Sequence, residues 1–106
     1  MRTTYLVPIT ILALLSTVAG APEQVVRQKG RAFSVVSMTV ARGQPVVFLN
    51  DDTVPHNVMS STLENAFDLG SQMPGSATPV SFDRAGIVAV ICAIHPRMRM
   101  VITVTD

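Results

Sequence analysis

Cysteine is nearly absent from this chain of 106 residues: Cys92 is the only one, so no disulfide can form within the chain. Tryptophan is missing altogether, and the single tyrosine, Tyr5, lies close to the N-terminus. Any folded core must therefore be built mainly from Val, Ile and Met and from four phenylalanines. These are Phe33, Phe48, Phe67 and Phe82.

The chain also lacks an excess of charge of either sign. It carries eight Lys and Arg residues against seven Asp and Glu, for a net charge of +1. Removal of the N-terminal segment, which contains Arg2, would leave seven basic residues and seven acidic ones. A neutral chain with scattered charges is not typical of a nucleic-acid-binding protein. It offers no polybasic segment for a membrane surface either.

No apolar run is long enough to suggest a stable membrane anchor. The run from Tyr5 to Val18 is shorter than the 18 or so residues that a span needs, and it contains Pro8. A positive N-terminus, this run and the small residues that follow it predict a secretory signal over residues 1–21. We therefore expect one domain, residues 22–106, in a periplasmic or otherwise exported protein with no membrane span after cleavage.

Helical periodicity is also missing after the signal; short β-type runs alternate with turn residues instead. Seven short strands at this spacing predict an all-β fold, a small antiparallel β-sandwich. Residues 61–77 are predicted to be mostly loop, with one helical turn at 63–66. The predicted strands are Glu23–Arg27, Ser37–Ala41, Pro45–Leu49, His56–Met59, Thr78–Phe82, Ile87–Cys92 and Met100–Thr105.

The residues that bind metals best fall in two short segments. Cys92 ends an alternating strand, His95 follows three residues later and Met98 six residues later, while His56 lies 36 residues before Cys92. The spacing of Cys92, His95 and Met98 suits a tight turn on which their side chains converge. Two imidazoles, a thiolate and a weak thioether are the ligands that hold copper in electron-transfer sites.

Each of these residues, taken alone, has a plainer interpretation. His56 is typical of a loop histidine and Met98 of a core side chain. Cys92 is typical of a small buried hydrophobe, but metal ligation would protect an unpaired thiol in an oxidising compartment. Zinc sites rarely use a thioether, and a c-type haem needs a C-x-x-C-H motif that the sequence lacks. A nucleophilic Cys–His pair also needs a residue to orient the histidine, and the sequence shows no obvious Asn or Asp for it.

These segments resemble the cupredoxins, the blue or type 1 copper proteins, and among them amicyanin and, in its N-terminal half, plastocyanin. The resemblance covers residues 33–105. Its motifs are VVFLN at 46–50, PHNV at 55–58, FDRAGIVAVIC at 82–92 and C-x-x-H-P-x-M at 92–98.

The resemblance implies a Greek-key sandwich that holds one copper ion. Carried over by position, His56 and His95 are the imidazole ligands, Cys92 is the thiolate and Met98 is the weak axial ligand. Met100 is a rival for the axial position; the shorter spacing from Cys92 and the match to the family motif favour Met98.

Two further residues take roles beside the copper in this resemblance. The backbone N–H of Asn57 is expected to donate to the Cys92 sulfur. Pro96 has no N–H and so cannot add a second hydrogen bond to the thiolate.

The function implied is that of a one-electron carrier, not an enzyme, that meets dehydrogenase- or cytochrome-type redox partners transiently. We expect a monomer whose electrons leave through the exposed edge of His95. A periplasmic copper-binding or copper-resistance protein, which holds or delivers copper, is the alternative, since extra methionines favour Cu(I). The expected apolar patch around His95 is Pro55, Met73, Pro74, Ile94 and Pro96, and the extra methionines are Met38, Met59, Met73 and Met100.

Overall fold

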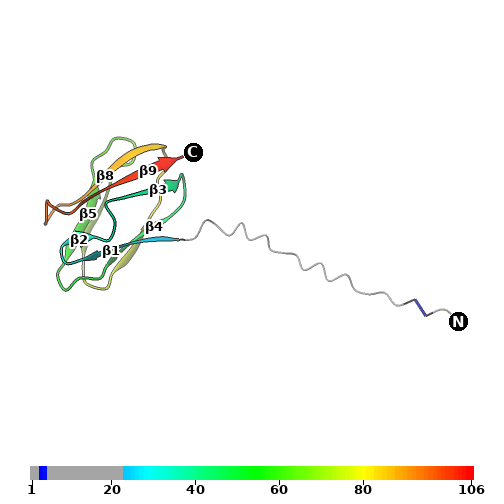
Figure 1. The fold of residues 1–106 in the computed structure, drawn as a ribbon, viewed down its shortest axis with the longest axis horizontal. Helices are drawn as coiled ribbons and strands as arrows, with labels where there is room; N and C mark the ends of the chain where they lie inside the picture. The colour runs from blue at the N-terminus through cyan, green and yellow to red at the C-terminus, as the bar shows by residue number, and fades with distance from the viewer. Residues whose placement is uncertain (1–2, 5–22) are drawn as a thin grey trace.

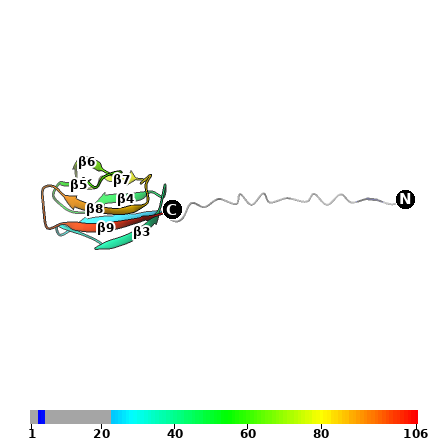
Figure 2. The same ribbon diagram turned by 90° about the horizontal axis from the view of Figure 1, so that it is seen from above.

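Nine strands form two sheets in the computed structural model, which describes residues 3–4 and 23–106. One sheet has the order β2-β1-β4-β7 and the other the order β3-β9-β8-β5-β6. Figure 1 shows β3, β8 and β9 on one side of the molecule and β1 and β4 on the other, and Figure 2 shows the layers from above. The strands are β1 Gln24–Lys29, β2 Ala32–Phe33, β3 Ser37–Ala41, β4 Val46–Asn50, β5 His56–Ser60, β6 Phe67–Gln72, β7 Ala77–Val80, β8 Gly86–Cys92 and β9 Arg99–Thr105.

The predicted all-β sandwich is confirmed, with two corrections. It contains nine strands rather than seven, because β2 and β6 were not predicted. It is mostly rather than wholly antiparallel, since β1 pairs with β4 and β3 pairs with β9 in parallel.

The segment predicted to be loop with a helical turn contains β6 instead. Residues 63–66 form no helix, and Asn65 N–H donates to the Thr62 carbonyl in a simple turn. β6 was not predicted because it contains Asp68 and Gly70, whose residue types are depleted in strands.

The core lies between the two sheets and is built from alternate residues of the strands. Val88, Val90 and Cys92 on β8 are all fully buried, so the cysteine faces the core as its alternation predicts. Burial of such side chains is the main stabilising contribution in a small domain. The core cluster is Val26, Val40, Val46, Phe48, Val58, Phe82, Val88, Val90, Met100, Ile102 and Val104.

The strand registers bring several loops to one end of the sandwich, here called the His95 end. β5 starts at His56, β8 ends at Cys92, and Val58 pairs with Cys92. Residues 93–98 connect β8 to β9 at this end, which Figure 1 shows opposite the C-terminus. The loops at 30–31, 51–55 and 73–76 lie there too, since the strand ends that flank them are paired.

The predicted signal falls outside the described residues, apart from Thr3 and Thr4. Among the residues that are described, none belongs to a helix that could span a membrane.

Candidate metal centre

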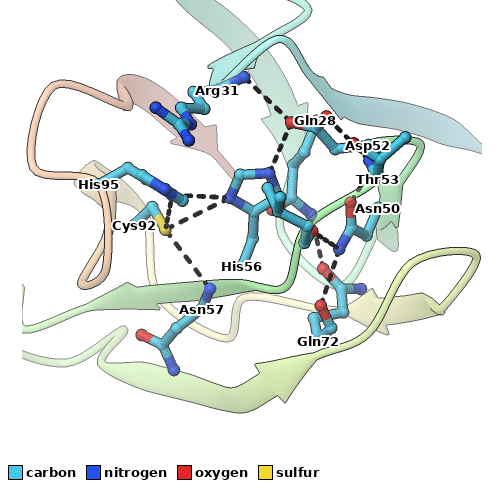
Figure 3. Close-up of polar contacts among 11 residues, drawn as sticks. Gln28, Arg31, Asn50, Asp52, Thr53, His56, Asn57, Gln72, Cys92 and His95 are labelled. Carbon is cyan, nitrogen blue, oxygen red and sulfur yellow. Dashed lines mark hydrogen bonds and ion pairs between the residues drawn. The ribbon is translucent and has the colours of Figure 1, made fainter.

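Three ligand-type atoms converge at the His95 end. The Nδ1 atoms of His56 and His95 are 3.1 Å apart, and Cys92 Sγ lies 3.7 Å from the first and 3.8 Å from the second. Figure 3 shows the two rings and the sulfur pointing toward one another. Bonds of about 2.0 Å to imidazole and about 2.3 Å to thiolate place ligand atoms on one ion roughly 3–4 Å apart. The three residues therefore fit a single metal ion.

The three ligand residues differ in their access to solvent. Cys92 and His56 are 0 % exposed, whereas His95 is partly exposed. The sandwich thus shields Cys92 and His56 from solvent, and the centre reaches the surface through the imidazole ring of His95.

Strand pairing and one loop contact fix the sulfur. The backbone N–H of Asn57 donates to Cys92 Sγ at 3.4 Å, the contact that the family resemblance implies. The Asn57 carbonyl in turn accepts the N–H of Ala93 at 3.2 Å. The segments that carry His56 and Cys92, 36 residues apart in sequence, are thereby joined next to the centre.

Two hydrogen bonds hold the backbone of Met98 next to Cys92 and His95. Its N–H donates to the His95 carbonyl at 2.9 Å, and its carbonyl accepts the N–H of Cys92 at 3.1 Å. Met98 is 1 % exposed and is not part of the core cluster, whereas Met100 on β9 belongs to that cluster. The side chain of Met100 is therefore already used in packing, which favours Met98 as the thioether of the centre.

Asp52 is a site residue that the sequence did not reveal. Its Oδ2 lies 2.9 Å from His56 Nε2, the ring nitrogen that faces away from Cys92. A carboxylate at this position keeps the proton on Nε2 and leaves the Nδ1 lone pair free for a metal. The hypothesis that no Asp is placed to orient a histidine is therefore wrong for His56. In the sequence, the only indication of this contact is that Asp52 lies four positions before His56, in a polar turn.

The Asp52 carboxylate is itself held by backbone groups. Arg31 N–H donates to Oδ2 at 3.0 Å and Thr53 N–H to Oδ1 at 2.9 Å. The Arg31 N–H above all, and then the hydrogen bonds from His56 and Thr53, hold the pKa of Asp52 well below its usual range. Asp52 is thus a charged carboxylate that bridges the β1–β2 turn and His56.

The β1–β2 turn explains how Arg31 reaches Asp52. Gly30 and Arg31 have φ angles of 60° and 57°, the two positive values of a type I′ hairpin turn. Glycine adopts such a conformation freely, but arginine does so at a cost. The hydrogen bond from Arg31 N–H to Asp52 offsets part of that cost.

A second carboxylate supports the sulfur indirectly. Asp68 Oδ1 accepts the N–H of Gly70 and the side-chain amide of Asn57, both at 2.8 Å. These two hydrogen bonds, first that of Gly70, lower the pKa of Asp68. The register of β5 and β6 shifts between Asn57 and Met59, and Gly70 has a φ of 66° there. Asp68 and this β-bulge therefore hold Asn57 in place next to Cys92.

A buried amide network stiffens the loop that precedes His56. The Asn50 side chain is fully buried and donates to the carbonyls of Val54 and Gln72. Gln72 accepts a hydrogen bond from Gln28 and donates to the Phe48 carbonyl. The network ties β1, β4 and β6 together behind His56.

The surface around His95 is an open pocket lined by Arg31, Ile94, His95, Pro96 and Arg97. Ile94 and Pro96 belong to the expected apolar patch, and Met73 is exposed as well. The two arginines were not predicted at this surface. They come from segments more than 60 residues apart, which only the fold brings together.

Comparison with known proteins identifies the family of this chain. A family model described as copper binding proteins of the plastocyanin/azurin family matches residues 22–105. Among curated proteins, no sequence matches the chain.

Solved structures share the fold. An amicyanin from Paracoccus versutus is 26% identical, with a TM-score of 0.71 and coverage of 82% of this chain and 87% of that protein. A purple cupredoxin from Nitrosopumilus maritimus is 21% identical, with a TM-score of 0.69 and coverage of 77% and 99%. A copper-containing nitrite reductase from Thermus scotoductus SA-01 is 22% identical with a TM-score of 0.73; 79% of this chain matches only 22% of that much longer protein.

Proposed function

Because the chain belongs to the plastocyanin/azurin family of copper-binding proteins, we propose that it is an exported blue-copper protein that carries one electron at a time between redox partners. Bound copper supplies a one-electron couple, Cu(II)/Cu(I). The ligands that we assign are His56, Cys92, His95 and Met98. The observation that carries the proposal is the convergence of two imidazole nitrogens and one sulfur within 3.8 Å, with one ring at the surface.

The protein's part in this function is to keep the ligands still. Cys92 receives the Asn57 N–H, His56 is oriented by Asp52, and Met98 is held by two backbone hydrogen bonds. A site whose ligands are fixed before the electron arrives needs little rearrangement when it changes charge. His95, the partly exposed ligand, provides the route to the surface.

We further propose that the protein is a carrier rather than an enzyme. Cys92, His56 and Asp52 together resemble the order of a Cys–His–Asp triad, but Cys92 and His56 are both 0 % exposed. A nucleophile has to contact its substrate, and neither of these side chains is open to solvent.

A redox titration of the purified copper protein tests this function. We expect an intense visible absorption from the Cu(II)–thiolate bond, bleached by one electron equivalent of reductant and restored by one of oxidant. The Cys92→Ser variant should lack the colour because a hydroxyl is a poor ligand for this site. A colourless Cu(II) protein would contradict the proposal. Loss of Cu(I) to a weak chelator during cycling would favour the alternative that the protein delivers copper. The exposed thioether of Met73 supports this alternative, because thioethers bind Cu(I).

A further inference from the structure

Charged side chains are unevenly distributed along this sandwich, although its described domain, residues 23–106, has equal numbers of acids and bases. At the His95 end, cationic side chains outnumber acidic ones five to two. At the opposite end, acidic side chains outnumber cationic ones four to two. The His95 end carries Arg27, Lys29, Arg31, Arg97, Arg99, Asp51 and Asp52, and the opposite end carries Glu23, Glu64, Asp83, Asp106, Arg42 and Arg84, with Asp68 on β6 between them.

Both acidic side chains at the His95 end are already engaged. Asp51 pairs with Arg27 at 3.8 Å, and Asp52 binds His56 and the Arg31 backbone. In the part of the chain that the structure describes, no carboxylate forms an ion pair with the guanidinium of Arg31, Arg97 or Arg99. These cations are therefore available to a partner.

These three arginines lie near His95, the partly exposed candidate ligand. Arg31 and Arg97 line the same open pocket as His95, and Figure 3 draws the Arg31 guanidinium on the His95 side of the centre. Arg99 is exposed and folds back on the loop, where its Nε donates to the Pro96 carbonyl at 3.0 Å. Two apolar side chains, Ile94 and Pro96, line the same pocket as Arg31 and Arg97.

We propose that this surface, formed by Arg31, Ile94, His95, Pro96, Arg97 and Arg99, docks a redox protein whose electron-transfer site is ringed by carboxylates. The inference rests on the proposed carrier function and names the partner class. Opposite charges steer the two proteins together, and the apolar centre of the surface permits close contact once water is displaced. In the exchange, one electron leaves the reduced protein and the oxidised partner takes it up; no proton or covalent bond moves.

The test uses the copper protein with two cytochromes of similar potential. One has a haem edge ringed by carboxylates and the other a haem edge ringed by lysines. Amide NMR shifts of the Cu(I) protein locate the contact and give Kd without electron transfer, and stopped-flow mixing gives the bimolecular rate constant. At low salt we expect the acidic cytochrome to bind and to shift residues 30–32 and 94–99, and the basic cytochrome to bind at least tenfold more weakly.

The double variant Arg31→Gly/Arg97→Gln removes the two cations of the pocket. Glycine suits the positive φ of position 31 and keeps the N–H that binds Asp52, so the centre is preserved. The matched control is Arg42→Gln/Arg84→Gln, which removes two cations at the opposite end. We expect the first pair to weaken binding of the acidic cytochrome about tenfold at low salt and the second less than twofold. The difference in binding between the two double variants should vanish at about 0.5 M salt, which screens the charges.

Equal weakening by the two double variants, equal binding of the two cytochromes, or shifts centred on Val36, Ala89 and Val101 instead of residues 30–32 and 94–99 would each overturn the proposal. The optical spectrum of every sample is recorded first. A coloured, redox-active protein that fails to discriminate between the cytochromes refutes the docking surface alone. A colourless protein refutes the carrier function whatever it binds.

Discussion

Among single residues, Asp52 holds the ring of His56, the candidate ligand that is buried in the sandwich. Its carboxylate fixes the proton of His56 on Nε2, and its own charge is stabilised by two backbone N–H groups. Carboxylates that hydrogen-bond a ligating histidine raise its basicity and fix its ring. Asp52 thus acts through His56 and not on the metal itself.

Asp52→Asn should therefore weaken Cu(II) binding about 10–100-fold and raise the reduction potential, because a neutral amide supports the higher charge of Cu(II) less well. Competition with a chelator and a potentiometric titration measure the two effects. Asp51→Asn is the matched control, since this neighbour pairs with Arg27 instead of a histidine. Equal effects of the two variants would mean that only the general charge of the loop matters.

The two candidate thioethers can be separated by the same substitution at both positions. Met98→Leu should keep copper and colour but raise the potential, because loss of a weak axial bond disfavours Cu(II). Met100→Leu alters a core side chain at nearly constant volume and should leave the potential unchanged, with a stability cost below about 1.5 kcal/mol. The reverse pattern would assign the axial role to Met100.

The sequence predicted the candidate ligands from residue type and spacing alone, because Cys92, His95 and Met98 share one short loop. It did not predict Asp52 or Arg31 as neighbours of the centre. Arg31 meets Asp52 across 21 residues through a type I′ turn, and that approach depends on the pairing of β1 with β4. Contacts of this kind arise from tertiary structure and leave no local pattern.

Among the strands, the predictable ones are those with apolar residues at every second position. β3, β8 and β9 alternate cleanly and were predicted to within one residue. β6 was missed because a bulge at Gly70 and several polar residues interrupt its alternation. The parallel pairing of β1 with β4 could not be predicted, since strand periodicity carries no information on pairing partners.

The β5–β6 bulge gives the domain a pH-dependent contribution to stability. The pKa of Asp68 is lowered by the N–H of Gly70 and the amide of Asn57, so this carboxylate stabilises the fold when it is ionised. The contribution is complete above the unfolded-state pKa, about 3.9, and is lost as pH falls through the lower folded-state pKa.

We therefore expect Asp68→Asn to destabilise the protein at pH 6, and the difference from wild type to shrink below about pH 4. Urea unfolding at a series of pH values measures this difference. Asp83→Asn, in an exposed loop at the other end of the sandwich, serves as the control. A difference between wild type and Asp68→Asn that stays constant from pH 6 to pH 3 would contradict the assigned role of Asp68.

At the scale of the whole molecule, the domain is small and has no disulfide to support it. A bound metal that joins β5, β8 and the loop at 93–98 would add the missing cross-link. A ligand bound to the folded state alone stabilises it by about 4 kcal/mol at 1,000 times its Kd.

Removal of copper should accordingly lower the Tm by more than about 10 °C, since roughly 1 kcal/mol corresponds to 4–8 °C in a domain of this size. Calorimetry of the copper-loaded and copper-free protein measures the shift. Cys92→Ser should melt near the temperature of the copper-free wild type and should respond little to added copper. A Tm that is the same with and without copper would show that the fold does not depend on the centre.

X-ray absorption at the copper edge, recorded on the Cu(II) and Cu(I) forms, tests the central claim most directly. The geometry predicts two nitrogen neighbours at about 2.0 Å and one sulfur neighbour at about 2.3 Å in both oxidation states, with only small changes between them. Cys92→Ser should remove the short sulfur neighbour. A spectrum without a short sulfur neighbour, or a change in the number of ligands on reduction, would contradict a fixed centre built from His56, Cys92 and His95.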